Sequence, residues 1–236
     1  MPLRMGRAPL SSLPPIPSRG WTPVGMTRLV VGLGNPGTEH EWTRHNVGFH
    51  VLDRILAVAG GRDDGALFRS ARRLEGYNGP RDFSWARLGE PDAFLLRPET
   101  YMNRSGDVVA PIARFLFPQG EEGVPLNVTQ VMVVYDDIDL DLGRLRIRPH
   151  GGHGGQNGMR SIITHLGTDQ FPRLRVGIGP SGTDAARHVL QLFPDKDRVE
   201  AEISIAEAAE AILDWLGTGD LEGCMTRYHS RWNQES

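Results

Sequence analysis

The chain has 236 residues, of which 39% are hydrophobic and 23% are charged. These values are ordinary for a soluble globular protein of one generous domain, and no apolar run approaches the length of a membrane span. A formal net charge of −3 disfavours a protein whose whole surface binds nucleic acid, so an RNA contact would need a local arginine cluster. The single cysteine, Cys224, excludes an internal disulfide and fits a reducing compartment.

Residues 1–26 form a segment rich in proline and serine that contains arginines but no acidic residue. Because the segment has no hydrophobic periodicity, we expect it to be disordered. It is either a transit segment or the product of a start codon assigned too early, with Met26 as the first residue. The remainder, residues 27–236, is long enough for one domain with a substantial core.

The stretch from Leu29 to Gly48 combines a predicted strand with polar side chains that follow it. It opens with an apolar run typical of a buried strand, residues 29–31, and then breaks into a turn rich in glycine and proline. Asn35 lies in that turn, and His45 follows ten positions later. An amide and an imidazole near the end of a strand indicate a binding or catalytic site.

The same turn, residues 32–37, also fits the G-x-G-x-x-G fingerprint of dinucleotide-binding proteins. That fingerprint requires a helix that starts among the glycines and points its N-terminus at a pyrophosphate. Here Pro36 occupies a variable position, and residues 38–41 have no apolar periodicity. The acidic residue near the required distance, Asp53, lies in a helical pattern and not at the end of a strand. The context therefore disfavours a nucleotide site.

Strands and helices are predicted to alternate along the chain. Apolar and alternating runs predict strands at residues 29–31, 83–88, 93–96, 131–135, 145–148 and 174–178. Apolar residues at helical spacing predict helices at residues 42–59, 106–117, 159–166, 185–193, 199–216 and 221–232, the last of them capped by Asp220. A surface loop is expected at residues 118–127. Because some neighbouring strands form hairpins, we predict an α/β domain with a mixed sheet flanked by helices.

Polar residues follow several of the predicted strands and occupy a glycine-rich loop; they are Asn35, His45, Asn103, Asp136 and Asn157. Ligands of open α/β sheets bind outside the carboxyl ends of the strands, so we expect these side chains to converge. A carboxylate bonded to one nitrogen of His45 would leave the other nitrogen to take a proton from water. Amide groups could then stabilise an oxyanion. This inventory predicts hydrolysis of an ester or amide without a metal ion.

Each of these residues also has a plainer interpretation. An asparagine after glycine is most often a turn residue, and Asp136 could simply end a loop or cap a helix. His150 and His153 flank glycines and could bind a metal ion, but two histidines without a further ligand make a weak site. The other histidines are assigned to packing or to the surface; they are His50, His165, His188 and His229.

Five motifs in a fixed order resemble bacterial-type peptidyl-tRNA hydrolase. They are G-L-G-N-P-G through T-R-H-N-V-G in residues 32–48, R-P-E-T-Y-M-N-R-S-G in 97–106, D-D-I-D-L in 136–140, G-G-H-G-G-Q-N-G in 151–158 and F-P-R-L-R-V-G-I-G in 171–179. The resemblance extends over residues 27–232. It implies one catalytic domain, residues 27–236, with a twisted mixed sheet. It also implies hydrolysis of the ester between a peptide and the 3′-terminal ribose of tRNA, which recycles prematurely released peptidyl-tRNA during translation.

The resemblance further implies roles for single residues. His45 would be the general base, Asp136 would stabilise its basic form, and Asn35 would help to distinguish blocked from free aminoacyl-tRNA. Contacts with the tRNA 3′ end or the peptide would come from Tyr101, Asn103 and Asn157, with Met102 lining the pocket. The partner would be peptidyl-tRNA, bound through its 3′ CCA end and acceptor stem. We expect no cofactor, metal ion or membrane association, and we expect a cytoplasmic monomer.

Two positions depart from the family pattern. His40 stands where an aromatic residue, usually Tyr, is common, and Gln156 stands where His is frequent. We expect His40 to change substrate affinity without abolishing activity. Arg146 and Arg148 alternate with apolar residues, so they share one strand face and would either bind tRNA phosphates or face solvent. The competing function is an RNA-binding module on the same fold, which would have no chemical need for a histidine–aspartate pair.

Overall fold

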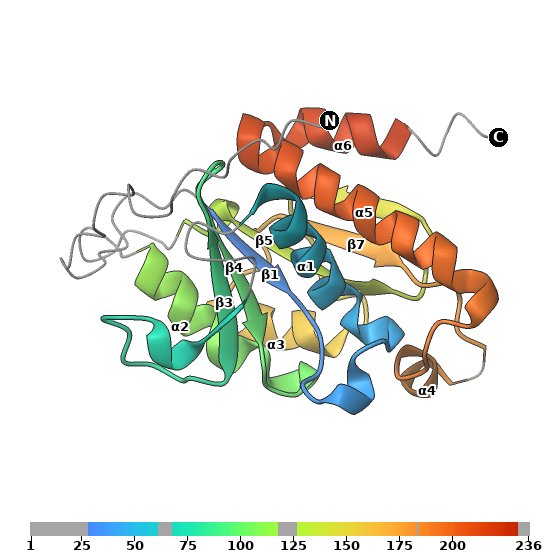
Figure 1. Ribbon diagram of the computed structural model, residues 1–236, viewed down its shortest axis with the longest axis horizontal. Coiled ribbons are helices and arrows are strands. Elements are labelled where there is room, and N and C mark those ends of the chain that lie inside the picture. The colour runs from blue at the N-terminus through green and yellow to red at the C-terminus, as the bar shows by residue number, and fades with distance from the viewer. Residues whose placement is uncertain (1–27, 61–67, 118–126, 183, 231–236) are drawn as a thin grey trace, which may run out of the picture.

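The computed structural model describes residues 28–60, 68–117, 127–182 and 184–230 (Figure 1). The predicted disordered segment, residues 1–26, and nearly all of the predicted loop at residues 118–127 lie outside this part of the chain. Within the described ranges, no helix is both long and apolar enough to cross a membrane.

Seven strands form one sheet in the order β2-β3-β4-β1-β5-β7-β6. Their bounds are β1 Leu29–Gly32, β2 Arg69–Ser70, β3 Phe83–Leu88, β4 Ala93–Pro98, β5 Val131–Asp137, β6 Leu145–Arg148 and β7 Arg173–Gly177. The four central strands, β4, β1, β5 and β7, run parallel, whereas β2, β3 and β6 are antiparallel to their neighbours. The predicted mixed sheet is therefore confirmed, and the carboxyl ends of the central strands meet at one edge.

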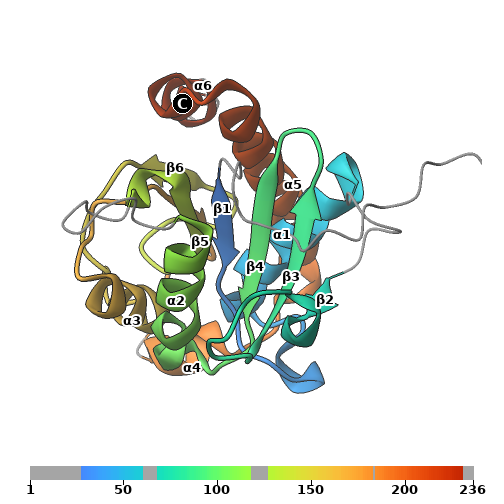
Figure 2. The same cartoon turned by 90° about the vertical axis from the view of Figure 1, so that its left-hand side faces the viewer.

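Helices cover both faces of this sheet. Their bounds are α1 Val47–Ala59, α2 Gly106–Leu116, α3 Asn157–Leu166, α4 Ala185–Val189, α5 Asp195–Thr218 and α6 Leu221–Ser230. Figure 2 shows α1 and α5 on one side of the sheet and α2 and α3 on the other. Each face has its own apolar core, one with α1, α5 and α6 and one with α2 and α3. The result is a three-layer α/β sandwich.

Strand β5 explains how one strand serves both cores. Met132 and Val134 belong to the core under α1 and α5, whereas Val133 and Tyr135 belong to the core under α2 and α3. Because side chains alternate along a strand, Asp136 continues the row of Met132 and Val134, and Asp137 continues the other row. The carboxylates of Asp136 and Asp137 therefore extend from the end of β5 toward opposite faces of the sheet.

The beginning of α1 lies directly against the sheet because two glycines leave room for it. A Cβ on Gly48 would lie 2.5 Å from the backbone nitrogen of Leu33 and 2.5 Å from the carbonyl oxygen of Val134. A Cβ on Gly32 would lie 2.3 Å from the carbonyl oxygen of Gly48. Any side chain at these positions would push the helix away from the strands. The close approach holds the residues that precede α1 beside the end of β5.

Two predicted helices extend at least four residues beyond the observed ones. The helix predicted from residue 42 begins at Val47, and two short 3-10 turns precede it, η1 Thr38–His40 and η2 Arg44–Asn46. Trp42 does not extend the buried stripe of α1, since its side chain is 37% exposed. The helix predicted to reach residue 193 ends at Val189, because Leu192 instead forms a β-bridge with Thr43.

Two further local features complete the comparison with the sequence. The predicted cap of the last helix is confirmed, since Gly223 N–H donates to Oδ1 of Asp220 at 2.8 Å. The two-residue strand β2 and the 3-10 turn η3 Ala71–Arg73 were not predicted, because the region from residue 70 to 80 is charged and poorly patterned.

Candidate active site

His45 and Asp136 form a buried pair at the carboxyl edge of the sheet. His45 comes from η2 and is 8% exposed, and Asp136 comes from the end of β5 and is 3% exposed. Nδ1 of His45 lies 2.8 Å from Oδ1 of Asp136. The other ring nitrogen, Nε2, remains available for a proton.

Gln156 fixes the direction of the hydrogen bonds around this pair. Its Oε1 accepts a hydrogen bond from the backbone N–H of Met159 at 2.8 Å, as the N-cap of α3. A backbone N–H can only donate, so the amide orientation is determined and Nε2 faces the site. Nε2 donates to Oδ1 of Asp136 at 3.1 Å and to Sδ of Met102 at 3.2 Å.

This arrangement determines the tautomer of His45. As a carboxylate, Asp136 can only accept hydrogen bonds. Nδ1 of His45 therefore donates to Oδ1 of Asp136, which also accepts from Nε2 of Gln156. The neutral imidazole therefore carries its hydrogen on Nδ1, and Nε2 is the basic nitrogen.

Asn35 is held by a second set of directed hydrogen bonds. The side chain of Asn46 grips the Asn35 backbone, accepting from its N–H at 2.8 Å and donating to its carbonyl oxygen at 3.0 Å. The backbone N–H of Met102 donates to Oδ1 of Asn35 at 2.9 Å. The carbonyl oxygen of the Asn35 amide is thus occupied, so its Nδ2 group is oriented to donate elsewhere.

A cavity of about 530 Å³, which we call the His45 cavity, opens beside the pair. Its lining includes His45, Asp136, Gln156, Asn157 and the glycine loop of residues 151–155. The volume lies within the range of sites that bind small ligands. The imidazole ring of His45, which carries the basic nitrogen Nε2, therefore lines a cavity large enough for a small ligand.

Four arginines share one face of β6 and β7 next to this cavity. Arg146 pairs with Arg175 and Arg148 pairs with Arg173 in the antiparallel register, so all four side chains lie on the same side of the sheet. Arg173 is buried and donates to the carbonyl oxygens of Gly151, Gly152, Asp169 and Phe171, so it holds the glycine loop. Arg175 forms an ion pair with Asp137. Arg148 is exposed and, with Arg173 and Arg175, lines the His45 cavity.

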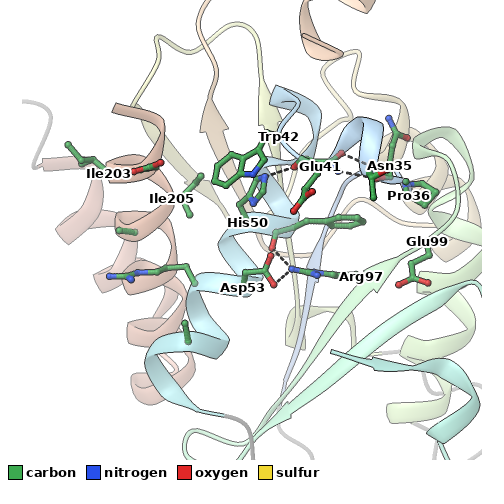
Figure 3. A pocket seen from close by; sticks show the side chains of 18 of the residues that line it. Asn35, Pro36, Glu41, Trp42, His50, Asp53, Arg97, Glu99, Ile203 and Ile205 are labelled. Atoms are coloured by element: carbon green, nitrogen blue, oxygen red, sulfur yellow. Dashed lines mark hydrogen bonds and ion pairs between the residues drawn. The ribbon is translucent and has the colours of Figure 1, made fainter. Parts of the chain in front are cut away.

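A second cavity of about 1090 Å³, which we call the Trp42 cavity, lies between α1, α5 and the turn that follows β1. Figure 3 shows Trp42 above His50 and Arg97 against Asp53, with Ile203 and Ile205 on one side and Asn35 on the other. Asn46 lines this cavity, whereas its neighbour His45 lines the other one. The η2 turn therefore belongs to the walls of both cavities.

The predicted site residues divide into a buried, hydrogen-bonded group and an exposed or half-buried group. His45, Asp136, Asn35 and Met102 are buried and connected by the hydrogen bonds described above. The exposed or half-buried residues are Tyr101, at 65% exposure, Asn103, Asn157, His40, Arg146 and Arg148. Among the described residues, no group of three or more metal-ligating side chains gathers, and His150 and His153 instead line the His45 cavity.

Three contributors received no role in the site from the sequence. Asn46 grips Asn35, Gln156 orients Asp136, and Arg175 lies on the arginine face. The alternation of arginine and apolar residues at 173–176 repeats that at 145–148 and was the available signal for Arg175. Nothing in the sequence alone indicates that Gln156 and Asp136 touch.

Comparison with known proteins identifies the family of this chain. A sequence model described as peptidyl-tRNA hydrolase matches residues 29–236. Peptidyl-tRNA hydrolases of Oceanobacillus iheyensis and Caldanaerobacter subterraneus subsp. tengcongensis are 38% and 39% identical, over 80% and 85% of this chain and 92% and 98% of theirs. The crystal structure of peptidyl-tRNA hydrolase from Acinetobacter baumannii aligns with a TM-score of 0.71 at 30% identity, covering 86% of this chain and 96% of that one. This chain belongs to the peptidyl-tRNA hydrolase family.

Proposed function

We propose that this chain hydrolyses the ester bond between the peptide and the 3′-terminal ribose of peptidyl-tRNA, with His45 as the general base. Family membership supports the reaction. The single observation that supports the mechanism most strongly is the hydrogen bond of Nδ1 of His45 to Oδ1 of Asp136 at 2.8 Å. It leaves Nε2 as the basic nitrogen in a ring that lines the His45 cavity. We assign the reaction to residues 27–236 as one catalytic domain.

The reaction begins with a water molecule between His45 and the ester. Nε2 takes a proton from the water while the water oxygen attacks the ester carbonyl carbon. Negative charge develops on the carbonyl oxygen, and the Nδ2 group of Asn35 is the donor that we assign to it. Asp136 stabilises the imidazolium that forms.

The tetrahedral intermediate then collapses. The bond between the carbonyl carbon and the ribose 3′ oxygen breaks, and the imidazolium returns its proton to that oxygen. The products are a peptide with a free carboxyl group and a tRNA with a free 3′ hydroxyl. Water is the only co-reactant, so this scheme uses neither a cofactor nor a metal ion.

The charge around the His45 cavity supports placing the tRNA end there. Its lining contains three arginines and two acidic residues, together with the histidines at 45, 150 and 153. Arg148 is exposed and Arg146 half-buried on the same face, so both can contact phosphates of the CCA end or acceptor stem. Asn157, in the same cavity, is assigned to the 3′-terminal ribose or the peptide.

The exposed and half-buried residues near this centre are assigned to contacts with the substrate. Tyr101 and Asn103 flank Met102, whose backbone binds Asn35, so they stand next to the reacting centre. The Tyr101 ring is open to solvent and can stack on an unpaired base. His40, half-buried in η1, is assigned to substrate contact. We infer a cytoplasmic monomer, because the substrate arises in translation and one chain supplies both His45 and Asp136.

The reaction is tested by release of a labelled amino acid from tRNA. The wild-type protein should release N-acetylated amino acid from N-acetyl-aminoacyl-tRNA and leave the free aminoacyl-tRNA intact. Binding of tRNA without any release from the blocked form would instead identify an RNA-binding module.

A further inference from the structure

The Trp42 cavity has an aromatic floor and an apolar side. The rings of Trp42 and His50 are stacked, with centroids 4.2 Å apart, and Nε2 of His50 lies 2.6 Å from the carbonyl oxygen of Glu41. On the α5 side stand Val199, Ile203 and Ile205. Ile203 is 47% exposed, so its apolar surface is available for contact (Figure 3).

Acidic residues outnumber arginines in the lining of the Trp42 cavity, whereas arginines outnumber acidic residues in the lining of the His45 cavity. The lining of the Trp42 cavity contains four acidic residues, Glu41, Asp53, Glu99 and Glu202, against two arginines, Arg54 and Arg97. Arg97 is already paired with Asp53 and donates to the carbonyl oxygen of Phe49. Burial lowers the pKa of His50, so its imidazole adds no positive charge at neutral pH. Phosphates of tRNA are therefore disfavoured here.

The Trp42 cavity adjoins the proposed reacting centre, because the η2 turn lies in the walls of both cavities. Asn35 and Asn46 line the Trp42 cavity, and Asn35 carries the amide that we assign to the ester carbonyl. His45, adjacent to Asn46, lines the cavity on the other side. A substrate whose ester lies at η2 can extend its nucleic-acid part toward the arginines and its other part toward Trp42.

We propose that the Trp42 cavity binds an apolar segment of the peptide attached to tRNA, several residues away from the ester. This assignment rests on the proposed function, since it extends the same substrate in the opposite direction from the tRNA. The volume of about 1090 Å³ exceeds what a single acylated amino acid needs and suits a short peptide. Apolar side chains pack on Trp42, Ile203 and Ile205, and the acidic rim favours a neutral or basic peptide over an acidic one.

Two substrates separate this subsite from the reaction itself. The short substrate is N-acetyl-aminoacyl-tRNA, and the long substrate is tRNA that carries an apolar hexapeptide. Trp42→Ala and Ile203→Asp should lower kcat/KM for the long substrate about tenfold, the scale of one lost apolar contact, and change it less than about twofold for the short one. Val58→Asp is the matched control, because Val58 is exposed on α1 and lines neither cavity.

Binding of the free hexapeptide, measured by fluorescence anisotropy, makes the test independent of turnover. Weaker peptide binding in Trp42→Ala and Ile203→Asp, but not in Val58→Asp, supports the subsite. Unchanged peptide binding in both variants, or equal losses on the short and long substrates, overturns it. Failure of the wild-type protein to cleave the short substrate refutes the proposed function, and the anisotropy series still decides the subsite.

Discussion

His45 and Gln156 donate to the same carboxylate oxygen of Asp136, at 2.8 and 3.1 Å. The three residues come from the turn before α1, the end of β5 and the N-cap of α3, so three separate elements determine one tautomer. The backbone N–H of Met159 can only donate a hydrogen bond, so it fixes the orientation of the Gln156 amide. The basic nitrogen of His45 is thus specified by the fold.

Replacing Asp136 by asparagine tests the charge without removing the acceptor. The new amide oxygen could still accept from His45 and Gln156, but the imidazolium would lose its negative neighbour. We expect Asp136→Asn to lower kcat by about 10²- to 10⁴-fold, the scale of general base catalysis, with tRNA affinity nearly unchanged. Single-turnover release of N-acetyl amino acid measures the effect. Asp137→Asn is the control, since Asp137 pairs with Arg175 and not with His45; equal losses in both variants would refute the assignment.

Gln156 can be changed so that its two functions separate. Gln156→Ser keeps a hydroxyl acceptor for the N-terminus of α3 but is too short to reach Asp136. We expect stability to be nearly unchanged, kcat to fall about tenfold, as for the loss of one hydrogen bond to a charged group, and the Nδ1–H tautomer of His45 to become less populated. Nitrogen-15 NMR of the imidazole reports the tautomer directly. A wild-type tautomer in Gln156→Ser would show that Asp136 needs no support from Gln156.

The arginine face predicts a change in salt dependence. Arg146→Ala and Arg148→Ala should each weaken tRNA binding and reduce the slope of log K against log salt by about one, as expected for one lost phosphate contact. The control is Arg72→Ala, because Arg72 is exposed beside β2 at the opposite edge of the sheet from β6. Unchanged slopes in the first two variants would mean that this strand face only meets solvent.

His229 predicts a loss of stability in acid. Its Nε2 accepts from the backbone N–H of Ile147 at 2.8 Å, which requires the neutral imidazole. Burial, and to a lesser extent Arg148 and Arg146, lowers the pKa of His229. The unfolded chain therefore takes up a proton at higher pH than the folded chain, so the free energy of unfolding falls as pH drops below about 6.5.

The variant that tests this effect is His229→Gln, whose amide oxygen can accept the same hydrogen bond but cannot titrate. Urea unfolding at a series of pH values between about 5 and 7.5 should show a shallower fall for the variant than for the wild type. The remaining slope includes His50, whose pKa is also lowered by burial. Parallel curves for the two proteins would exclude His229 as a source of the acid sensitivity.

The sequence predicted the parts of this molecule that depend on local patterns. The hairpin of β3 and β4 follows from two apolar runs around a turn at residues 89–92, and the sheet class follows from the alternation of strands and helices. The meeting of His45 with Asp136 could be anticipated because both follow the carboxyl ends of neighbouring central strands.

What the sequence did not predict depends on contacts between distant segments. The arginine face requires the register of β6 against β7, which no single strand pattern contains. The Trp42 cavity requires η1, α1 and α5 to meet, so Trp42 was mistaken for the start of a helix. The support of Asp136 by Gln156 depends on a side chain that caps one helix and reaches the end of a strand.

The most direct test of the mechanism is the turnover of His45→Ala on N-acetyl-aminoacyl-tRNA, measured together with its tRNA affinity. The base acts only in the transition state, so we predict that kcat falls by about 10²- to 10⁴-fold. The dissociation constant for tRNA should stay within about twofold of the wild type, since the loss is in the transition state and not in binding. Turnover close to that of the wild type would contradict the assignment of His45 as the general base.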